Sequence, residues 1–157
     1  MFDVVVVYLT RQSGESAEVL LGVKARGLGT GRLVGPGGKV LPGENLADAA
    51  SREVWEEVGV SVSPTNLHHM ATLTYPFPDR PENSQRSSVF TATTFSGMAT
   101  KSDELDPHWF RWDEIPWEHM WDDAKLWLPQ VLTGQFVEAT FTMGPDDRVV
   151  DAIWSSI

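Results

Sequence analysis

Cysteine is absent from the 157-residue chain. This absence excludes disulfide bonds, thiolate catalysis, zinc–thiolate centres and iron–sulfur clusters. Long apolar runs are also lacking, since no segment approaches the ~20 residues of a transmembrane helix. The apolar run Val4–Leu9 is short and has no basic segment before it, unlike a secretory signal peptide. We therefore expect a soluble, cytoplasmic protein that has no membrane partner.

Basic residues are scarce: 12 Lys and Arg stand against 22 Asp and Glu, a formal net charge of −10. Such a surface repels phosphate backbones, so a nucleic-acid polymer is not an expected partner. A small anionic substrate remains compatible where a metal ion or a local basic cluster neutralises it. The length and a hydrophobic content of 41% fit one globular domain spanning residues 1–157.

The order of apolar patterns predicts many strands and two helices. One helix is expected between an N-cap at Asn45 and a closing Gly59, and the other over 121–132. The glycine-rich segment 27–38 and the proline-containing segment 76–85 are expected to be loops, the second of them mobile. Strands are predicted over 4–9, 18–23, 69–75, 87–95, 109–112, 136–143 and 149–154. This mixed order indicates an α+β fold, layered as an α/β/α sandwich.

Three carboxylates gather on one ridge of the first predicted helix. At about 100° per residue, Glu53, Glu56 and Glu57 lie within one arc beside the apolar stripe. Their mutual repulsion needs an offset, which Arg52 or a hard divalent cation such as Mg²⁺ can supply. The alternative is an acidic, solvated helix face with no ligand.

The spacing of these residues matches a known signature at every defined position. It runs from Gly38 through Glu44 and Arg52-Glu53-Val54 to Glu56-Glu57 and Gly59-Val60, and resembles the Nudix signature. The resemblance implies a Nudix fold, a mixed sheet between helices with a catalytic loop–helix–loop. It also implies hydrolysis of nucleoside diphosphate derivatives with Mg²⁺, for which Mn²⁺ can substitute.

The resemblance also implies roles for individual residues. The expected metal ligands are Glu53, Glu56 and Glu57, with a carbonyl of Gly37 or Gly38. Glu57, or another acid nearby, is expected to orient or deprotonate the attacking water. Arg52 and Glu44 resemble the pair that orients the helix and its carboxylates.

Outside the signature, the chain is similar to the MutT-type branch over nearly its whole length, least so over 76–86. This implies cleavage of nucleoside triphosphates to monophosphate and pyrophosphate, including oxidised purine nucleotides (8-oxo-dGTP-like) in nucleotide-pool sanitation. Lys24 and Lys39 then correspond to cations for the phosphates, Trp121 to a base-stacking ring and Asp123 to a reader of the purine edge. The alternatives are a strand lysine at 24, a core tryptophan at 121 and a helix cap at 123.

Several positions depart from the branch. Val34 stands where a base-reading Asn is expected, and Ala124 replaces the second acid of an Asp pair, although Asp122 is one place earlier. Each loss removes hydrogen-bond readout of the base. Lys101 replaces a glutamate that resembles an accessory catalytic or metal-binding acid. Asp103 or Glu104 could take its role, and the alternative is that both are exposed loop acids.

Other functions remain open at this stage. One is a Nudix hydrolase of ADP-ribose, a nucleotide-sugar or a dinucleoside polyphosphate, for which Pro76 is a faint cue. A second is a non-catalytic nucleotide-binding domain, which the complete set of signature carboxylates disfavours. The partner is a small nucleotide in the leading interpretation, and the protein is a monomer or a homodimer.

Overall fold

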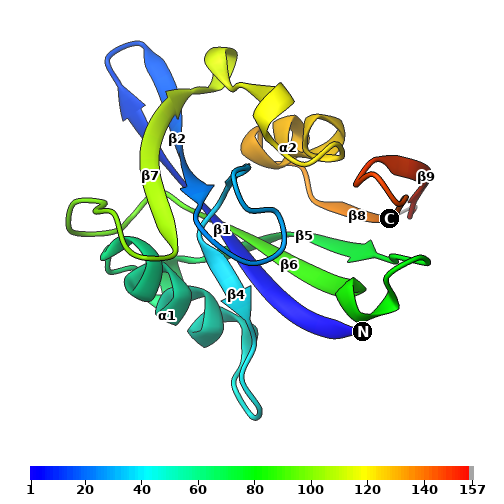
Figure 1. The fold of residues 1–157 in the computed structure, drawn as a ribbon. Helices are drawn as coiled ribbons and strands as arrows, with labels where there is room; N and C mark the ends of the chain where they lie inside the picture. Colours follow the sequence, from blue (N-terminus) through cyan, green and yellow to red (C-terminus); the bar gives the residue numbers. More distant parts are fainter. Residues whose placement is uncertain (156–157) are drawn as a thin grey trace.

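A curled mixed sheet with one α-helix on each face forms the protein (Figure 1). The computed structural model describes residues 1–155. The helices are α1 (Leu46–Val58) and α2 (Ala124–Leu132). The strands are β1 (Phe2–Ser13), β2 (Ser16–Lys24), β3 (Leu33–Val34), β4 (Gly37–Lys39), β5 (His68–Tyr75), β6 (Gln85–Ala92), β7 (Leu105–Arg111), β8 (Val137–Met143) and β9 (Val149–Trp154). The described residues also form the 3₁₀ turns η1 (Pro64–Asn66), η2 (Pro81–Asn83), η3 (Trp112–Glu114) and η4 (Trp117–His119). None of the described helices is long and apolar enough to cross a membrane.

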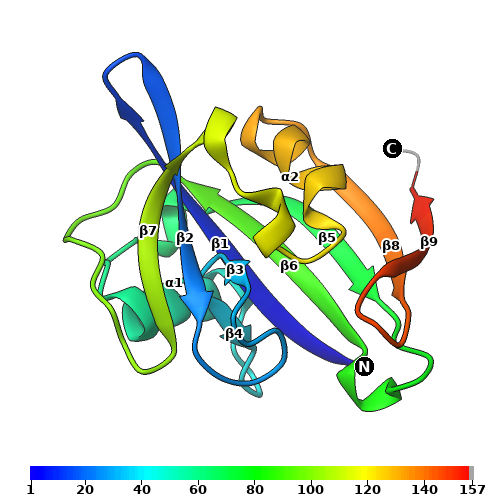
Figure 2. The ribbon, with the colours of Figure 1, turned by 45° about the horizontal axis from the view of Figure 1, so that its top comes forward.

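The long strand β1 is the centre of the sheet (Figure 2). It pairs in parallel with β6 along one side. On its other side, its first half pairs with β4 and its last residues, 10–13, pair with β2, both antiparallel. The main strand order is β3-β2-β1-β6-β5-β8-β9, and β7 pairs with β2. This arrangement brings the short strand β4, just before α1, against the middle of the sheet.

Two apolar cores lie on the two faces of the sheet. Val5, Val7 and Leu9 of β1 belong to the core that α1 covers. Tyr8, which points to the opposite face, belongs to the core under α2, together with Trp127. The expected α+β layering of helices on both faces is therefore observed.

Both predicted ends of α1 are confirmed. The side-chain oxygen of Asn45 accepts a hydrogen bond from the Asp48 N–H at 2.8 Å. Gly59 ends the helix with φ 71°, and its N–H donates to the Trp55 carbonyl. The local sequence thus fixes where α1 begins and ends.

Other predicted bounds were wrong by a few residues. The second helix begins at Ala124 rather than at 121, because the backbone turns tightly there and the Ala124 N–H donates to the Trp121 carbonyl. Strand β6 ends at Ala92 rather than at 95, and Ser96 beyond it forms an isolated bridge with Ser61. The expected short strand 109–112 begins earlier and ends earlier, because residues 105–111 pair along β2.

Candidate active site

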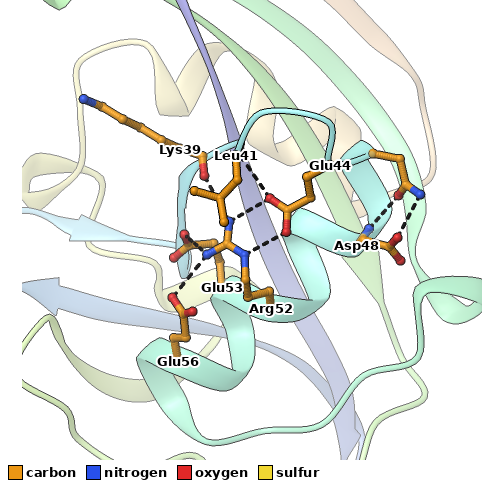
Figure 3. A network of polar contacts seen from close by, with 8 residues as sticks. Lys39, Leu41, Glu44, Asp48, Arg52, Glu53 and Glu56 are labelled. Atoms are coloured by element: carbon orange, nitrogen blue, oxygen red, sulfur yellow. Dashed lines mark hydrogen bonds and ion pairs between the residues drawn. The ribbon is translucent and has the colours of Figure 1, made fainter.

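Arg52 organises the acidic ridge of α1 (Figure 3). Its Nε and Nη2 donate to the two carboxylate oxygens of Glu44 at 2.8 and 2.9 Å. Its Nη1 donates to Glu53 at 2.8 Å and to Glu56 at 3.2 Å. Nη2 also donates to the Lys39 carbonyl at 3.1 Å, which ties the helix to β4. The bonds from Arg52 lower the pKa of Glu44 to about 2.

Glu57 is the most buried acid of the ridge, with 8% of its surface exposed. One of its carboxylate oxygens accepts a hydrogen bond from the Gly37 N–H at 2.7 Å. Burial raises the pKa of Glu57 to about 7, against the effect of this bond. Burial also raises the pKa of Glu53, although Arg52 opposes the shift. Burial is thus the main cause of both shifts.

The backbone of the glycine loop lies directly against these acids. A Cβ added to Gly38 would lie 2.6 Å from the Glu53 carboxyl carbon, so a side chain there would displace this carboxylate. A Cβ on Gly37 would collide with the backbone of Val5. Glycine at 37 is thus required for the close approach of β4 to β1, and glycine at 38 leaves the Glu53 carboxylate in its place.

A cavity of about 780 Å³ opens beside the acids. Glu53, Glu56 and Glu57 line it together with both lysines that the resemblance assigned to the phosphates, Lys24 and Lys39. The same cavity is lined by Gly37, Gly38, Val34, Trp121 and Asp123, so one space contains every predicted site residue except Arg52 and Glu44. Arg52 and Glu44 do not line the cavity, and their supporting role stays a prediction.

The two lysines differ in environment. Lys24 is half-buried at the end of β2, and burial lowers its pKa, against the attraction of Glu57 and Glu104. Lys39 is exposed, and its ammonium lies 4.8 Å from the centre of the Phe2 ring. In Figure 3 its side chain extends away from the Arg52 network. Lys24 is therefore the cation held close to the acids.

The far part of the cavity is aromatic and contains one buried acid. Asp123 is 2% exposed, and one of its oxygens accepts hydrogen bonds from the Tyr75 hydroxyl and the Trp127 N–H, both at 2.7 Å. Burial raises the pKa of Asp123. Although it stands at the helix N-cap position, its side chain makes no capping bond. The cap alternative for this residue is thus not what the structure shows.

The structure separates Asp122 from Asp123. Asp122 does not line the cavity, and its carboxylate accepts a bond from the Val149 N–H at 2.9 Å. Ala124 does line the cavity and offers no hydrogen bond there from its side chain. Asp122 therefore does not replace the missing second acid.

Glu104, from outside α1, lies close enough to Glu57 to affect its charge state. It lines the cavity, whereas Lys101 and Asp103 are exposed and do not. Its carboxylate accepts bonds from Arg26 at 2.7 and 3.1 Å, and its charge raises the pKa of Glu57. The sequence alone did not decide between Asp103, Glu104 and two exposed loop acids, because the pairing of β7 with β2 determines which of the two residues faces the cavity.

The donor set fits a hard divalent cation. It offers carboxylate oxygens and the backbone oxygens of a loop that lacks side chains, which are the ligands Mg²⁺ prefers. Within residues 1–155, no three acidic or histidine side chains form a preformed metal cluster, and Arg52 holds Glu53 and Glu56 by ion pairs. Arg52 contacts one oxygen of each of these two carboxylates, and each carboxylate has a second oxygen that could bind a metal ion.

Comparison with known proteins identifies the class. The sequence profile of the NUDIX domain matches residues 2–130. The chain belongs to the Nudix family and is a Nudix hydrolase, so it belongs to enzymes that generally use divalent metals and act on small nucleotide substrates.

Two curated relatives cover most of the chain. It is 42% identical over 114 residues to the oxidized purine nucleoside triphosphate hydrolase of Mus musculus. The matched residues cover 73% of this chain and 71% of the mouse enzyme. The chain is 36% identical over 137 residues to the enzyme of the same name from Danio rerio, covering 87% and 86%. A solved MutT protein from Bacillus halodurans shares the fold with a TM-score of 0.81, covering 99% and 98% at 24% identity.

Proposed function

We propose that this Nudix hydrolase cleaves purine nucleoside triphosphates to the monophosphate and pyrophosphate with Mg²⁺, and that oxidised purine nucleotides are its preferred substrates. One observation carries the proposal: the signature acids and the pair Trp121 and Asp123 face the same cavity. That cavity is thus acidic at one end and aromatic at the other, as a metal-bound triphosphate joined to a base requires. The names of the mouse and zebrafish relatives agree with a role in nucleotide-pool sanitation.

Glu53, Glu56 and Glu57 would hold Mg²⁺ together with a carbonyl of Gly37 or Gly38, and Mn²⁺ can take its place. When bound, the ion supplies positive charge that offsets the phosphate oxygens and eases ionisation of a water molecule. Only oxygen donors are needed from this chain, in agreement with its lack of cysteine.

Glu57 is the proposed general base, because it is the most buried signature acid and lines the cavity. It takes a proton from water, whose oxygen adds to one phosphorus of the α–β anhydride. The bond from that phosphorus to the bridging oxygen breaks, and pyrophosphate and the nucleoside monophosphate leave. Glu104 lies beside this position, and Arg52 with Glu44 holds the helix in place.

Lys24 and Lys39 are the proposed cations for the phosphates. Lys24 is next to Glu57 and is partly desolvated, so water screens its attraction for a phosphate less than at an exposed site. Lys39 is exposed at the rim and meets the outer phosphates. The net charge of −10 makes such local cations necessary for a triphosphate to approach.

Trp121 is the proposed stacking platform, since base–aromatic stacking contributes ~1–3 kcal/mol. Asp123 is the proposed reader of the purine edge, because it is a buried acid that lines the cavity together with Trp121. Val34 and Ala124 offer no side-chain hydrogen bond there. We expect discrimination between purines to depend mainly on Asp123 and on backbone groups of the cavity wall.

A product assay with Mg²⁺ tests this function. The panel contains unmodified, 8-oxo and 2-oxo purine nucleoside triphosphates, ADP-ribose, a nucleotide-sugar and a dinucleoside polyphosphate. Release of pyrophosphate, fastest from the oxidised triphosphates, is the expected result. Equal cleavage of all triphosphates would remove the preference for oxidised bases. Activity on ADP-ribose or the sugar alone would overturn the proposed substrate class, and binding without turnover would indicate a non-catalytic nucleotide-binding domain.

We also propose that residues 1–157 form one catalytic domain that acts as a monomer or a homodimer in the cytoplasm. Light scattering coupled to gel filtration distinguishes the two assembly states. A larger, stable assembly would contradict this part of the proposal.

A further inference from the structure

Two aromatic rings in the cavity wall are each covered by an arginine. The guanidinium carbon of Arg32 lies 4.6 Å from the centre of the Trp121 ring, and that of Arg80 lies 5.2 Å from the centre of the Phe77 ring. Phe77 and Trp121 meet edge to face, with centres 6.3 Å apart and an interplanar angle of 84°. The rings line the cavity, whereas the two arginines do not. The arginines therefore lie behind the rings, away from the space proposed for the nucleotide.

Both arginines converge on one carboxylate, that of Asp147. Arg80 Nη2 donates to one of its oxygens at 2.6 Å, and Arg32 Nη2 lies 3.8 Å from the other. Each arginine has a second anchor in the backbone: Arg32 donates to the Met120 carbonyl at 3.2 Å and Arg80 to the Gly144 carbonyl at 3.1 Å. Three segments that are distant in sequence are thus joined at Asp147.

The backbone at Asp147 is specialised for this position. It is the only non-glycine residue with positive φ in the described chain, at 61°, and it lies in the turn between β8 and β9. Asp and Asn adopt this conformation more readily than other side chains. The turn thus presents the carboxylate towards Arg32 and Arg80 with a residue type that tolerates its backbone.

The indole of Trp121 is confined on a second side by Gly29. A Cβ on Gly29 would lie 2.9 Å from the indole nitrogen, and Gly29 has φ 84°. The ring therefore has one face under Arg32 and its nitrogen edge against the loop backbone. Its orientation depends on the position of the loop that carries both Gly29 and Arg32.

From these contacts we propose that Asp147 is a positioning residue for nucleotide recognition. Through Arg32 and Arg80 it holds the Trp121 and Phe77 rings in the orientation that receives the base. The positioning role rests on the proposed function in one respect, because it assumes that a purine stacks on Trp121. Asp147 touches neither substrate nor metal in this proposal, so it should affect binding of the base and leave the phosphate chemistry unchanged.

The test is the variant Asp147→Asn, which keeps a residue compatible with positive φ and removes the charge that holds both arginines. We expect the Kd of a purine nucleoside monophosphate and the KM of the triphosphate to rise ~3–10-fold, a fraction of the stacking and cation–π contribution. The kcat should change less than about twofold, and inhibition by pyrophosphate, which has no base, should be unchanged.

Two further variants provide the controls. Arg32→Met should reproduce the rise in the monophosphate Kd, because it removes the charge over Trp121 but keeps an unbranched, flexible side chain. Arg11→Met is the matched control, since Arg11 also lies over a tryptophan, Trp109, at 4.0 Å but outside the cavity. It should leave both ligands unaffected. Thermal melts establish folding, and Arg32→Met replaces Asp147→Asn should the latter unfold below the assay temperature.

The outcomes separate this inference from the proposed function. An unchanged monophosphate Kd in both variants, or equal weakening of pyrophosphate and monophosphate, would overturn the positioning role. If the wild-type protein hydrolyses no triphosphate but binds the monophosphate in an Asp147-dependent manner, the proposed function fails and the positioning role remains.

Discussion

Arg52 holds Glu44 through two parallel hydrogen bonds of 2.8 and 2.9 Å, so the loop before α1 is fixed to the middle of that helix. The same guanidinium contacts Glu53 and Glu56 with its remaining nitrogen. A single side chain thus connects the frame of the site to the acids that face the cavity.

The first prediction concerns Glu44→Gln. Because Arg52 lowers the pKa of Glu44 from 4.5 to about 2 in the folded protein, ionised Glu44 stabilises the fold above about pH 4.5. This contribution is lost as the pH falls towards about 2. Thermal unfolding should therefore show a lower Tm for the variant at pH 7 and convergence with the wild type near pH 2. A difference in Tm that is constant over this range would show that the ion pair is not its source.

The second prediction concerns Glu57→Gln, which keeps the volume of the side chain but removes its charge. Turnover of a nucleoside triphosphate should fall at least ~10²-fold through loss of the base or of a metal ligand. The control is Glu15→Gln, an exposed residue in the hairpin between β1 and β2. Steady-state kinetics at saturating Mg²⁺ measure both, and unchanged turnover in Glu57→Gln would remove this residue from the catalytic machinery.

A third prediction compares two neighbouring glycines. In Gly38→Ala the new methyl group meets the end of the flexible Glu53 side chain, so the fold should persist while activity and Mg²⁺ affinity fall. In Gly37→Ala it meets the backbone of Val5, so stability should fall first. Circular dichroism melts and metal titration distinguish the two. The prediction fails if Gly38→Ala retains wild-type activity.

The fourth prediction concerns Tyr75→Phe. Removing the hydroxyl leaves the buried Asp123 with one fewer donor, at a cost of ~1–3 kcal/mol in the free energy of unfolding near neutral pH. The cost should shrink at low pH, where Asp123 is protonated and its need for donors is smaller. Urea unfolding at two pH values measures this. A cost that grows on acidification would contradict it.

Local patterns were sufficient to predict much of this molecule. The bounds of α1 were predicted correctly from the signature spacing, the cap at Asn45 and the closing Gly59. Each of these depends on residues within one or two helical turns. The start of α2 was placed too early, since apolar spacing continues through Trp121 while the backbone does not remain helical. The roles assigned to the site residues stay predictions.

The contacts that sequence reasoning missed all join residues distant along the chain. Nothing in the local pattern of Asp123 indicates that Tyr75 donates to it, and nothing in the turn at Asp147 indicates its two arginines. Likewise, the choice between Asp103 and Glu104 depends on strand pairing. Such contacts are set by the register of the sheet, which one sequence does not determine by itself.

The acids proposed for catalysis and the residues proposed to bind the base lie over different faces of the sheet. The acids stand on α1, above one core, whereas the tryptophan and aspartate proposed for the base come from the segment entering α2, above the other. We therefore expect substitutions on the α2 side, such as that at Ala124, to change which nucleotide binds and to leave hydrolysis unchanged. A protein of this construction can acquire a new substrate preference without any change to its catalytic helix.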